Sequence, residues 1–176
     1  MANELTTKIC SSIADTVSRI DKELKTIDNK GIFFAPELHI AFECGKTITS
    51  NGQNIWGQEK YKWKRETKFE NYGLADLFFT TDNGDKGLVI EFKILQTIDA
   101  YISDIEKLKR LDGEKFERFF CVILGFFENQ QNEHIDKLTE KYGEGIELKT
   151  KTTPRETWSI NYKGKIFYST VIWKVK

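Results

Sequence analysis

The sequence is short of cysteine, has no excess of charge of either sign, and contains no long apolar run. Cys10, Cys44 and Cys121 are widely separated and form no C-x-x-C pair, which argues against a disulfide framework and against a zinc site. We expect them to be small core residues in a reducing compartment. The chain has no run of about 18 apolar residues to span a bilayer and no apolar N-terminal secretion signal, so we expect a cytoplasmic location.

Charge is balanced overall but uneven along the chain. The 27 Lys and Arg residues match 27 Asp and Glu residues, so a globally basic nucleic-acid-binding protein is excluded. Residues 149–176 nevertheless carry a net charge of +6, and residues 126–147 a net charge of −4. Such an uneven distribution of charge is common among neutral soluble proteins and does not by itself indicate a function. Because the net charge is zero, any positive charge that binds nucleic acid must lie in a local cluster.

The 176 residues, 39% hydrophobic and 13% aromatic, suffice for one continuous core. Without repeats, low-complexity tracts or linkers, they predict a single domain over residues 1–176. Apolar residues recur every three or four positions near the start, which predicts an additional N-terminal helix over about residues 4–28. A second helix is expected to open at Pro36, because proline is favoured at the first helical position.

The rest of the chain predicts a mixed α/β domain. Residues 55–69 are expected to form a half-solvated strand, because lysines alternate with aromatic residues there. Further along, periodicity predicts helices over residues 98–111 and 133–142 and strands over residues 119–127, 157–162 and 166–175.

A hairpin is the strongest local prediction, because two short apolar runs flank the pair Asn83-Gly84. If these two residues form the loop, Asp76 comes to lie opposite Glu91 on the facing strand. Carboxylates so placed have Cβ atoms ~5 Å apart and repel each other unless a cation lies between them. Strand alternation puts Lys93 on the same face as Glu91. The pattern predicts a divalent-metal site; the alternative is a structural Glu91–Lys93 ion pair with Asp76 at a strand edge.

Asp76, followed after fourteen residues by Glu91-Phe92-Lys93, resembles the signature of the PD-(D/E)XK nuclease superfamily. The family usually has a proline before the aspartate, where this chain has Gly73-Leu74-Ala75. The resemblance covers roughly residues 33–127. It implies a three-layer α/β/α, restriction-endonuclease-like fold around a central mixed sheet, with the aspartate on one hairpin strand and the E-x-K motif on the next.

The resemblance also implies an activity, a metal-dependent endodeoxyribonuclease of restriction or defence type. Mg²⁺, for which Mn²⁺ can substitute, would be bound by Asp76, Glu91 and the backbone carbonyl of Phe92. Lys93 would position the attacking water or help to deprotonate it. Since one chain carries one site, a homodimer is expected if both DNA strands are cut.

Family members carry a glutamate on the helix before the hairpin, and Glu37 resembles it as a catalytic residue that touches the metal, directly or through water. Glu43 is the competitor. Six residues apart on one helix, the two lie about 240° apart around its axis, so both cannot face the sheet. Asp104 and Lys107, on the helix after the E-x-K motif, are interpreted as residues of an ordinary surface helix face, and whether either supports the site stays open.

The expected substrate contacts lie on the lysine-rich strand. Tyr61 and Trp63 either stack on bases or fill the core. Two other functions stay open, a resolvase of branched DNA and a non-cleaving nuclease-fold protein that binds nucleic acid or a partner. The histidines, His39 and His134, are interpreted as surface or packing residues. The candidates for nucleic-acid contact, besides the C-terminal lysines, are Lys60, Lys62, Lys64, Arg65 and Lys68.

Overall fold

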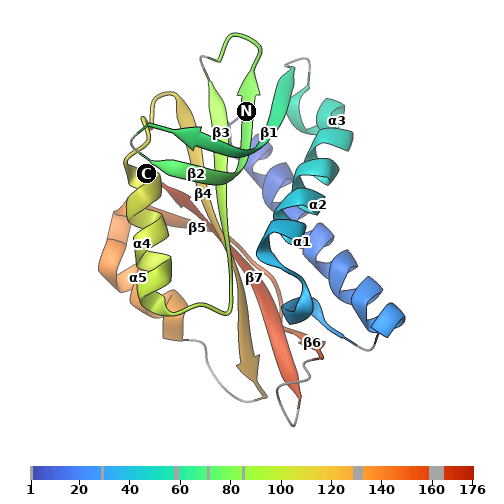
Figure 1. Ribbon diagram of the computed structural model, residues 1–176. Helices are drawn as coiled ribbons and strands as arrows, with labels where there is room; N and C mark the ends of the chain where they lie inside the picture. Colours follow the sequence, from blue (N-terminus) through green and yellow to red (C-terminus); the bar gives the residue numbers. More distant parts are fainter. Residues whose placement is uncertain are drawn as a thin grey trace.

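A seven-stranded mixed sheet forms the centre of the molecule, and helices cover both of its faces (Figure 1). The computed structural model describes residues 2–28, 30–57, 60–70, 72–84, 86–128, 133–158 and 165–176. The helical elements are α1 (Ala2–Asp28), η1 (Ile32–Phe34), α2 (Glu37–Ser50), α3 (Gly52–Trp56), α4 (Ile98–Lys109), α5 (Glu133–Tyr142) and η2 (Gly143–Gly145). The strands are β1 (Tyr61–Phe69), β2 (Gly73–Thr81), β3 (Gly87–Ile94), β4 (Phe116–Phe127), β5 (Ile146–Lys151), β6 (Arg155–Thr157) and β7 (Ile166–Val175).

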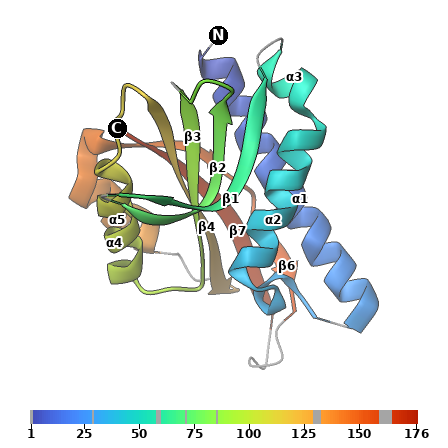
Figure 2. The ribbon, with the colours of Figure 1, turned by 45° about the horizontal axis from the view of Figure 1, so that its top comes forward.

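The sheet has the strand order β1-β2-β3-β4-β7-β5, and β6 also pairs with β7. Among the described strands only β3 and β4 pair in parallel, and α4 forms the crossover that a parallel connection requires. Figure 2 shows α1 and α2 on one side of the sheet and α4 and α5 on the other. The predicted mixed α/β class is therefore confirmed, as an arrangement of helix, sheet and helix layers.

The layer formed by α1 and α2 packs on one sheet face through a continuous apolar core. The centre of the stripe predicted for the N-terminal helix is buried, since Ile9, Ile13, Val17 and Ile20 are each at most 1% exposed, whereas Ile27 at its end is 80% exposed. All three cysteines are buried and free of disulfides, as expected for core residues. Among the described helices, none has both the length and the hydrophobicity of a transmembrane span.

The opposite face of the sheet is covered by α4 and α5. Both helices were predicted, over residues 98–111 and 133–142. Tyr101, Ile105 and Leu108 of α4 are buried against the sheet residues Phe120 and Val122. Helix α4 begins at a side-chain cap, because Thr97 Oγ1 accepts a hydrogen bond from the backbone N–H of Ala100 at 3.4 Å. This packing fixes the helix that later contributes side chains to the candidate site.

The hairpin has the predicted register but a different loop. The backbone N–H of Thr81 donates to the carbonyl of Lys86, and that of Gly84 donates to the carbonyl of Thr81, so the connection spans all the residues between Thr81 and Lys86. A two-residue type I′ turn needs positive φ at both central residues, and only Gly84, at φ 75°, has it. The predicted two-residue loop and the longer observed loop are both centred on the bond between Asn83 and Gly84. The register of the strands is therefore unchanged, and Leu77 still pairs with Ile90.

Other differences from the predictions lie at element ends. Residue 55 lies in the five-residue helix α3, which precedes β1, and not in the predicted strand. Pro36 is the N-cap residue of α2, so the first helical residue is Glu37 rather than the proline. The edge strand β5 was not predicted, since most of its side chains are exposed or half-buried. The strand expected over residues 157–162 ends at Thr157 in β6, and residues 159–164 lie outside the described residues.

Candidate functional site

The sheet divides at the point where the site lies. Pairing between β2 and β3 runs to Leu77 and Ile90 and stops there. Beyond this point β2 stays paired with β1 as far as Gly73, while β3 stays paired with β4 as far as Ile94. The departing ends of β1 and β2 bend toward α4 (Figure 1). Asp76 and Glu91 are therefore the first residues after the division, one on each side.

Asp76 bridges the two halves of the divided sheet. Its Oδ2 accepts a hydrogen bond of 2.8 Å from the backbone N–H of Phe92 in β3. The side chain is held next to Glu91, and its negative charge contributes to the raised pKa of that residue. The predicted proximity of Asp76 and Glu91 is present, through this contact rather than through a regular cross-strand pair.

Glu91 is a buried carboxylate, only 2% exposed. Its Oε1 accepts hydrogen bonds from the hydroxyl of Tyr72 and, at 2.9 Å, from Nζ of Lys107. Burial raises the pKa of Glu91 to about 7, helped by the charge of Asp76 and opposed by Tyr72 and Lys107. Near neutral pH this group is thus poised between its acid and its carboxylate, and a nearby cation favours the carboxylate.

Lys93 is held by two carboxylates from different helices. Its Nζ lies 3.0 Å from Glu37 Oε1, 3.1 Å from Asp104 Oδ2 and 3.1 Å from the carbonyl oxygen of Phe92. Burial alone would lower the pKa of Lys93, but the attraction of Glu37 and Asp104 outweighs it and raises the pKa above its ordinary value. Lys93 therefore keeps its positive charge at neutral pH, which favours a role in positioning over one in deprotonation.

Glu37 and Glu43, the two candidates for the site glutamate on the helix before the hairpin, have different surroundings. Glu37, the first residue of α2, reaches Lys93, and burial raises the pKa of its carboxyl against the pull of that lysine. Glu43 instead pairs with Arg19 of α1 at 2.7 Å and with Lys46 at 3.4 Å, and these contacts lower its pKa. The structure thus brings Glu37 to the site and uses Glu43 to hold α1 against α2.

Three further residues complete the site: Tyr72, which sequence reasoning missed, and Asp104 and Lys107, whose interpretation as surface residues was wrong, because they are only 14% and 23% exposed and contact Lys93 and Glu91. Tyr72, just before β2, was not considered. Asp104 and Lys107 come from α4, where spacings of three residues place Tyr101, Asp104 and Lys107 along one side of the helix. That spacing was the available signal. Lys107 also donates to the carbonyl of Leu74 at 2.6 Å, so it ties α4 to the departing end of β2.

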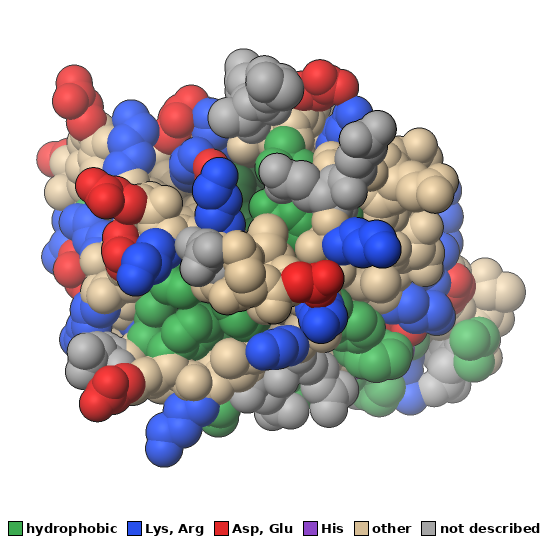
Figure 3. Space-filling view, turned by 90° about the horizontal axis from the view of Figure 1, so that it is seen from above, with side chains coloured by type: hydrophobic (Ala, Val, Ile, Leu, Met, Phe, Trp, Pro, Cys, Tyr) green, Lys and Arg blue, Asp and Glu red, His purple; other side chains and the backbone are tan. Residues whose placement is uncertain are grey.

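The predicted nucleic-acid-binding residues lie on β1 at the edge of the sheet, apart from Lys60, which directly precedes it. Lys60, Lys62, Lys64 and Lys68 are exposed, whereas the side chain of Arg65 lies outside the described residues. Figure 3 views the molecule from above, and on this face basic side chains are interspersed with acidic ones. This face therefore carries no uniform positive charge, in keeping with the neutral composition.

The two aromatic residues of β1 have separate surroundings. The Trp63 ring packs toward α2, where a Cβ on Gly45 would come within 2.4 Å of it. Trp63 therefore fills the core, one of its two expected roles. Tyr61 stacks on Trp56 with ring centroids 4.2 Å apart. His39 is exposed and His134 packs against Tyr101, in keeping with their predicted surface and packing roles.

The chemistry of the donor set suits a hard divalent cation. The site contains the four carboxylates of Glu37, Asp76, Glu91 and Asp104 and the two ammonium groups of Lys93 and Lys107, which leaves a formal charge of −2 when all are ionised. Carboxylate oxygens are the ligands that Mg²⁺ prefers. Within the described part of the chain, no three Asp, Glu, His or Cys side chains form a ready metal cage. The oxygens that could hold a metal here are those of Asp76 and Glu91 and the backbone carbonyl of Phe92.

Comparison with protein-family models and with curated proteins gives no match for this chain. The geometry of the site and the resemblance of Asp76, Glu91 and Lys93 to a nuclease motif are therefore the basis for a functional proposal.

Proposed function

We propose that this chain is a metal-dependent endodeoxyribonuclease of restriction or defence type, with a restriction-endonuclease-like fold. One observation carries the proposal: the sheet divides directly after Leu77 and Ile90, and the next residues, Asp76 and Glu91, are two adjoining carboxylates in a largely buried setting. Lys93 follows on the same strand. Two adjoining carboxylates in a buried setting repel each other and destabilise a fold, so their placement side by side favours a function.

The positions of the four predicted residues agree with the family pattern stated above. The aspartate lies on one hairpin strand, β2, and the E-x-K motif lies on the next, β3. Glu37 comes from the helix before the hairpin, and Asp104 and Lys107 come from the helix after it. These placements support the restriction-endonuclease-like fold as a proposal.

Asp76, Glu91 and the carbonyl of Phe92 would hold Mg²⁺ or Mn²⁺. When bound, such a cation supplies hydroxide near neutral pH and stabilises charge on the phosphate. In the structure the Phe92 carbonyl and the Glu91 carboxylate already face positive charge, from Lys93 and Lys107 respectively. The Phe92 carbonyl oxygen and the Glu91 carboxylate thus already accept hydrogen bonds from positively charged groups.

The chain's own residues account for positioning. Lys93 stays charged and has two carboxylate partners, so its ammonium group is oriented before substrate arrives. From there it would donate hydrogen bonds to the attacking water or to a phosphate oxygen. Glu37 and Asp104 act through Lys93, and Tyr72 and Lys107 act through Glu91. Lysines of β1 would contact the DNA backbone.

The test is cleavage of a supercoiled plasmid with Mg²⁺, with Mn²⁺ and with EDTA. Wild-type protein should cut with either metal and not with EDTA. Asp76→Asn keeps an oxygen that accepts from Phe92 but loses the charge, and Lys93→Met keeps the length of the side chain. Each should slow cleavage by about 100- to 1,000-fold. Lys115→Met, at an exposed position outside the site, should leave the rate unchanged.

The same assay separates the alternatives. A non-cleaving nucleic-acid-binding protein would leave the plasmid intact with both metals, which rejects the nuclease proposal. Faster cutting of a four-way junction or a flap than of duplex DNA would favour the resolvase. Conversion of plasmid to the linear form in one binding event requires two sites, and sedimentation should then detect the proposed homodimer.

A further inference from the structure

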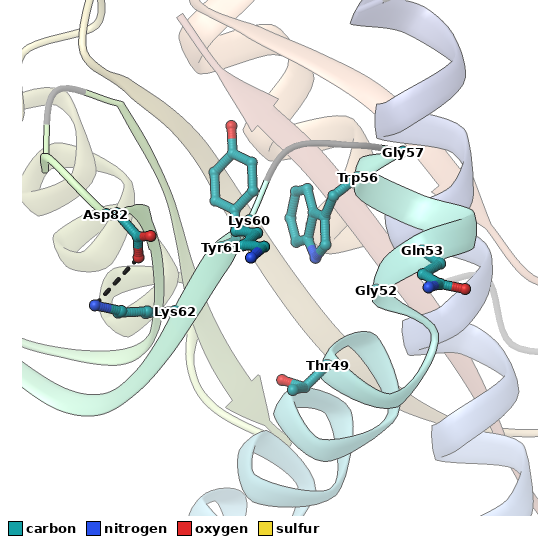
Figure 4. A pocket seen from close by; sticks show the side chains of 9 residues that line it. All are labelled: Thr49, Gly52, Gln53, Trp56, Gly57, Lys60, Tyr61, Lys62 and Asp82. Atoms are coloured by element: carbon teal, nitrogen blue, oxygen red, sulfur yellow. Dashed lines mark ion pairs between the residues drawn. The ribbon is translucent and has the colours of Figure 1, made fainter.

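An open pocket of about 770 Å³ lies where the end of α2, the short helix α3 and the start of β1 meet (Figure 4). Its volume falls in the range of about 300–1,000 Å³ that is usual for ligand sites. Its lining is separate from the carboxylates and lysines of the candidate nuclease site. The side chains that line it include Thr49, Gln53, Trp56, Tyr61, Lys62 and Asp82.

Two aromatic rings form one wall of this pocket. Trp56 from α3 and Tyr61 from β1 stack with their centroids 4.2 Å apart and their planes 25° apart, and Figure 4 shows the two rings side by side. Trp56 also contacts Phe79 of the core at a centroid distance of 5.6 Å. The rings are thus fixed from behind while both side chains stay half-exposed. A rigid aromatic wall of this kind suits a planar ring as ligand.

Two lysines flank the aromatic wall. Lys60 and Lys62 lie on either side of Tyr61 along the chain, and both are exposed. Nζ of Lys62 lies 3.1 Å from Asp82, but the two side chains are 66% and 61% exposed. An ion pair in such a position is weak and is easily exchanged for another anion. The pocket therefore offers aromatic rings and adjacent positive charge, the combination that a nucleobase and its phosphate require.

The pocket lies at one end of a row of exposed lysines. Lys62, Lys64 and Lys68 alternate along β1, and their partners on β2 run from Thr80 to Leu74. Asp76 lies on β2 six residues before Asp82, which directly follows that strand, so the two are at most ~20 Å apart along the chain. A nucleic-acid strand that follows β1 would therefore reach both the pocket and the carboxylate site.

We propose that this pocket binds an unpaired nucleobase of the nucleic-acid substrate, stacked against Trp56 and Tyr61, while Lys60 and Lys62 contact the phosphates beside it. This rests on the proposed function insofar as it takes the substrate to be a nucleic acid. It goes further by assigning a substrate class, strands that carry unpaired nucleotides within about 20 Å of the bond that is cut.

The test measures binding without cleavage. Fluorescence anisotropy in EDTA would give the affinity of the Asp76→Asn variant for a twelve-nucleotide oligothymidylate and for an abasic strand of the same length. The background variant should bind oligothymidylate more tightly than the abasic strand. Tyr61→Leu should weaken oligothymidylate binding at least about fivefold and abasic binding little. Replacing both Lys60 and Lys62 by alanine should weaken both and reduce the dependence on salt.

Matched controls make each outcome decisive. Lys115→Ala, an exposed lysine away from the pocket, should change neither affinity, and thermal unfolding followed by circular dichroism reports whether each variant folds. If Tyr61→Leu is folded and binds both strands as the background does, the pocket proposal is overturned. It is also overturned if oligothymidylate and abasic strands bind equally well.

Failure of the nuclease proposal can be distinguished from failure of the pocket proposal. Wild-type protein that never cuts with Mg²⁺ or Mn²⁺, but loses base-dependent binding with Tyr61→Leu, would retain the pocket proposal and lose the catalytic one. Cleavage together with base-independent binding would do the reverse.

Discussion

Nζ of Lys107 lies 2.9 Å from Oε1 of Glu91 and also donates to the carbonyl of Leu74, so one ammonium group joins α4 to both sides of the divided sheet. The same Nζ lies 4.4 Å from the centre of the Tyr72 ring, whose hydroxyl donates to Glu91. Lys107 thus neutralises the buried carboxylate and holds the departing strand. Its removal should affect both stability and pH dependence.

The first prediction concerns this lysine. Lys107→Met keeps most of the side-chain packing but leaves Glu91 without its nearest positive charge. Because Glu91 can respond by taking up a proton, we expect a loss of ~1–3 kcal/mol in the free energy of unfolding at pH 8 rather than the larger loss of a broken, fixed pair. Urea unfolding would measure it. Lys115→Met should stay within ~0.5 kcal/mol of wild type; an equal loss in both variants would contradict the prediction.

The second prediction is a pH dependence. The pKa of Glu91 is raised from its ordinary value of 4.5 to about 7, so between these pH values the folded protein binds more protons than the unfolded chain. The stability that this group contributes is therefore complete below about pH 4.5 and is lost as the pH rises through 7. A shift of this size corresponds to ~3 kcal/mol.

Glu91→Gln provides the comparison. Glutamine cannot ionise, but its amide oxygen can still accept from Tyr72. In EDTA, wild-type protein should lose more stability than Glu91→Gln between pH 5 and pH 8, and urea unfolding of both at each pH measures the difference. Parallel curves would show that Glu91 titrates normally in the folded protein. For wild type, Mg²⁺ at 100 times its Kd should restore ~2.7 kcal/mol at pH 8, beyond the effect of KCl at equal ionic strength.

The third prediction separates the two glutamates of α2. Glu37→Gln removes the charge beside Lys93, so cleavage should slow by about 10- to 100-fold, as for other groups that orient catalytic residues. Glu43→Gln should leave cleavage within about twofold and lower the free energy of unfolding by at most ~1 kcal/mol, through its pair with Arg19. The rate of Mg²⁺-dependent plasmid cutting measures both. Similar slowing by the two variants would reverse the assignment.

The fourth prediction tests the packing of α2 on β1. A Cβ on Gly45 would come within 2.4 Å of the Trp63 ring, so Gly45→Ala forces the ring or the helix to move and should cost ~1–3 kcal/mol. Gly52 is the matched control, because its added Cβ would lie 3.5 Å from Trp56, an ordinary contact. Gly52→Ala should be neutral or stabilise by up to ~1 kcal/mol. Thermal unfolding compares them, and equal destabilisation would disprove the close fit.

Much of the fold could be predicted because its signals are local. The stripe in α1 and the apolar run of β4 are periodic or continuous, and each was placed within a few residues. The edge strand β5 escaped prediction because Glu147 and Leu148 are exposed and the strand has few apolar residues to mark it. Helix α3 is only five residues long and depends on tertiary contacts such as the stacking of Trp56 on Tyr61.

At the site, the sequence was sufficient to predict the residues on the hairpin. It was not sufficient to predict the residues that reach the site because β2 bends away from β3. The positions of Asp76 and Glu91 follow from hairpin register, which is local. Tyr72 reaches Glu91 only because β2 leaves β3 and turns toward α4, and no short-range pattern encodes that turn. Contacts across the layers, such as Lys93 with Glu37, likewise depend on how α2 packs.

The reversal between β2 and β3 is centred on the bond joining Asn83 and Gly84, and the paired residues on either side of it fix which side chains lie on each face. An insertion that the loop absorbs leaves every facing pair in place, whereas one residue inserted within the paired part of either strand moves the side chains beyond it to the opposite face. Asp76 would then meet an apolar neighbour in place of Glu91. Changes of length should therefore be tolerated at the tip of the loop and not within the paired strands wherever the two acids are kept.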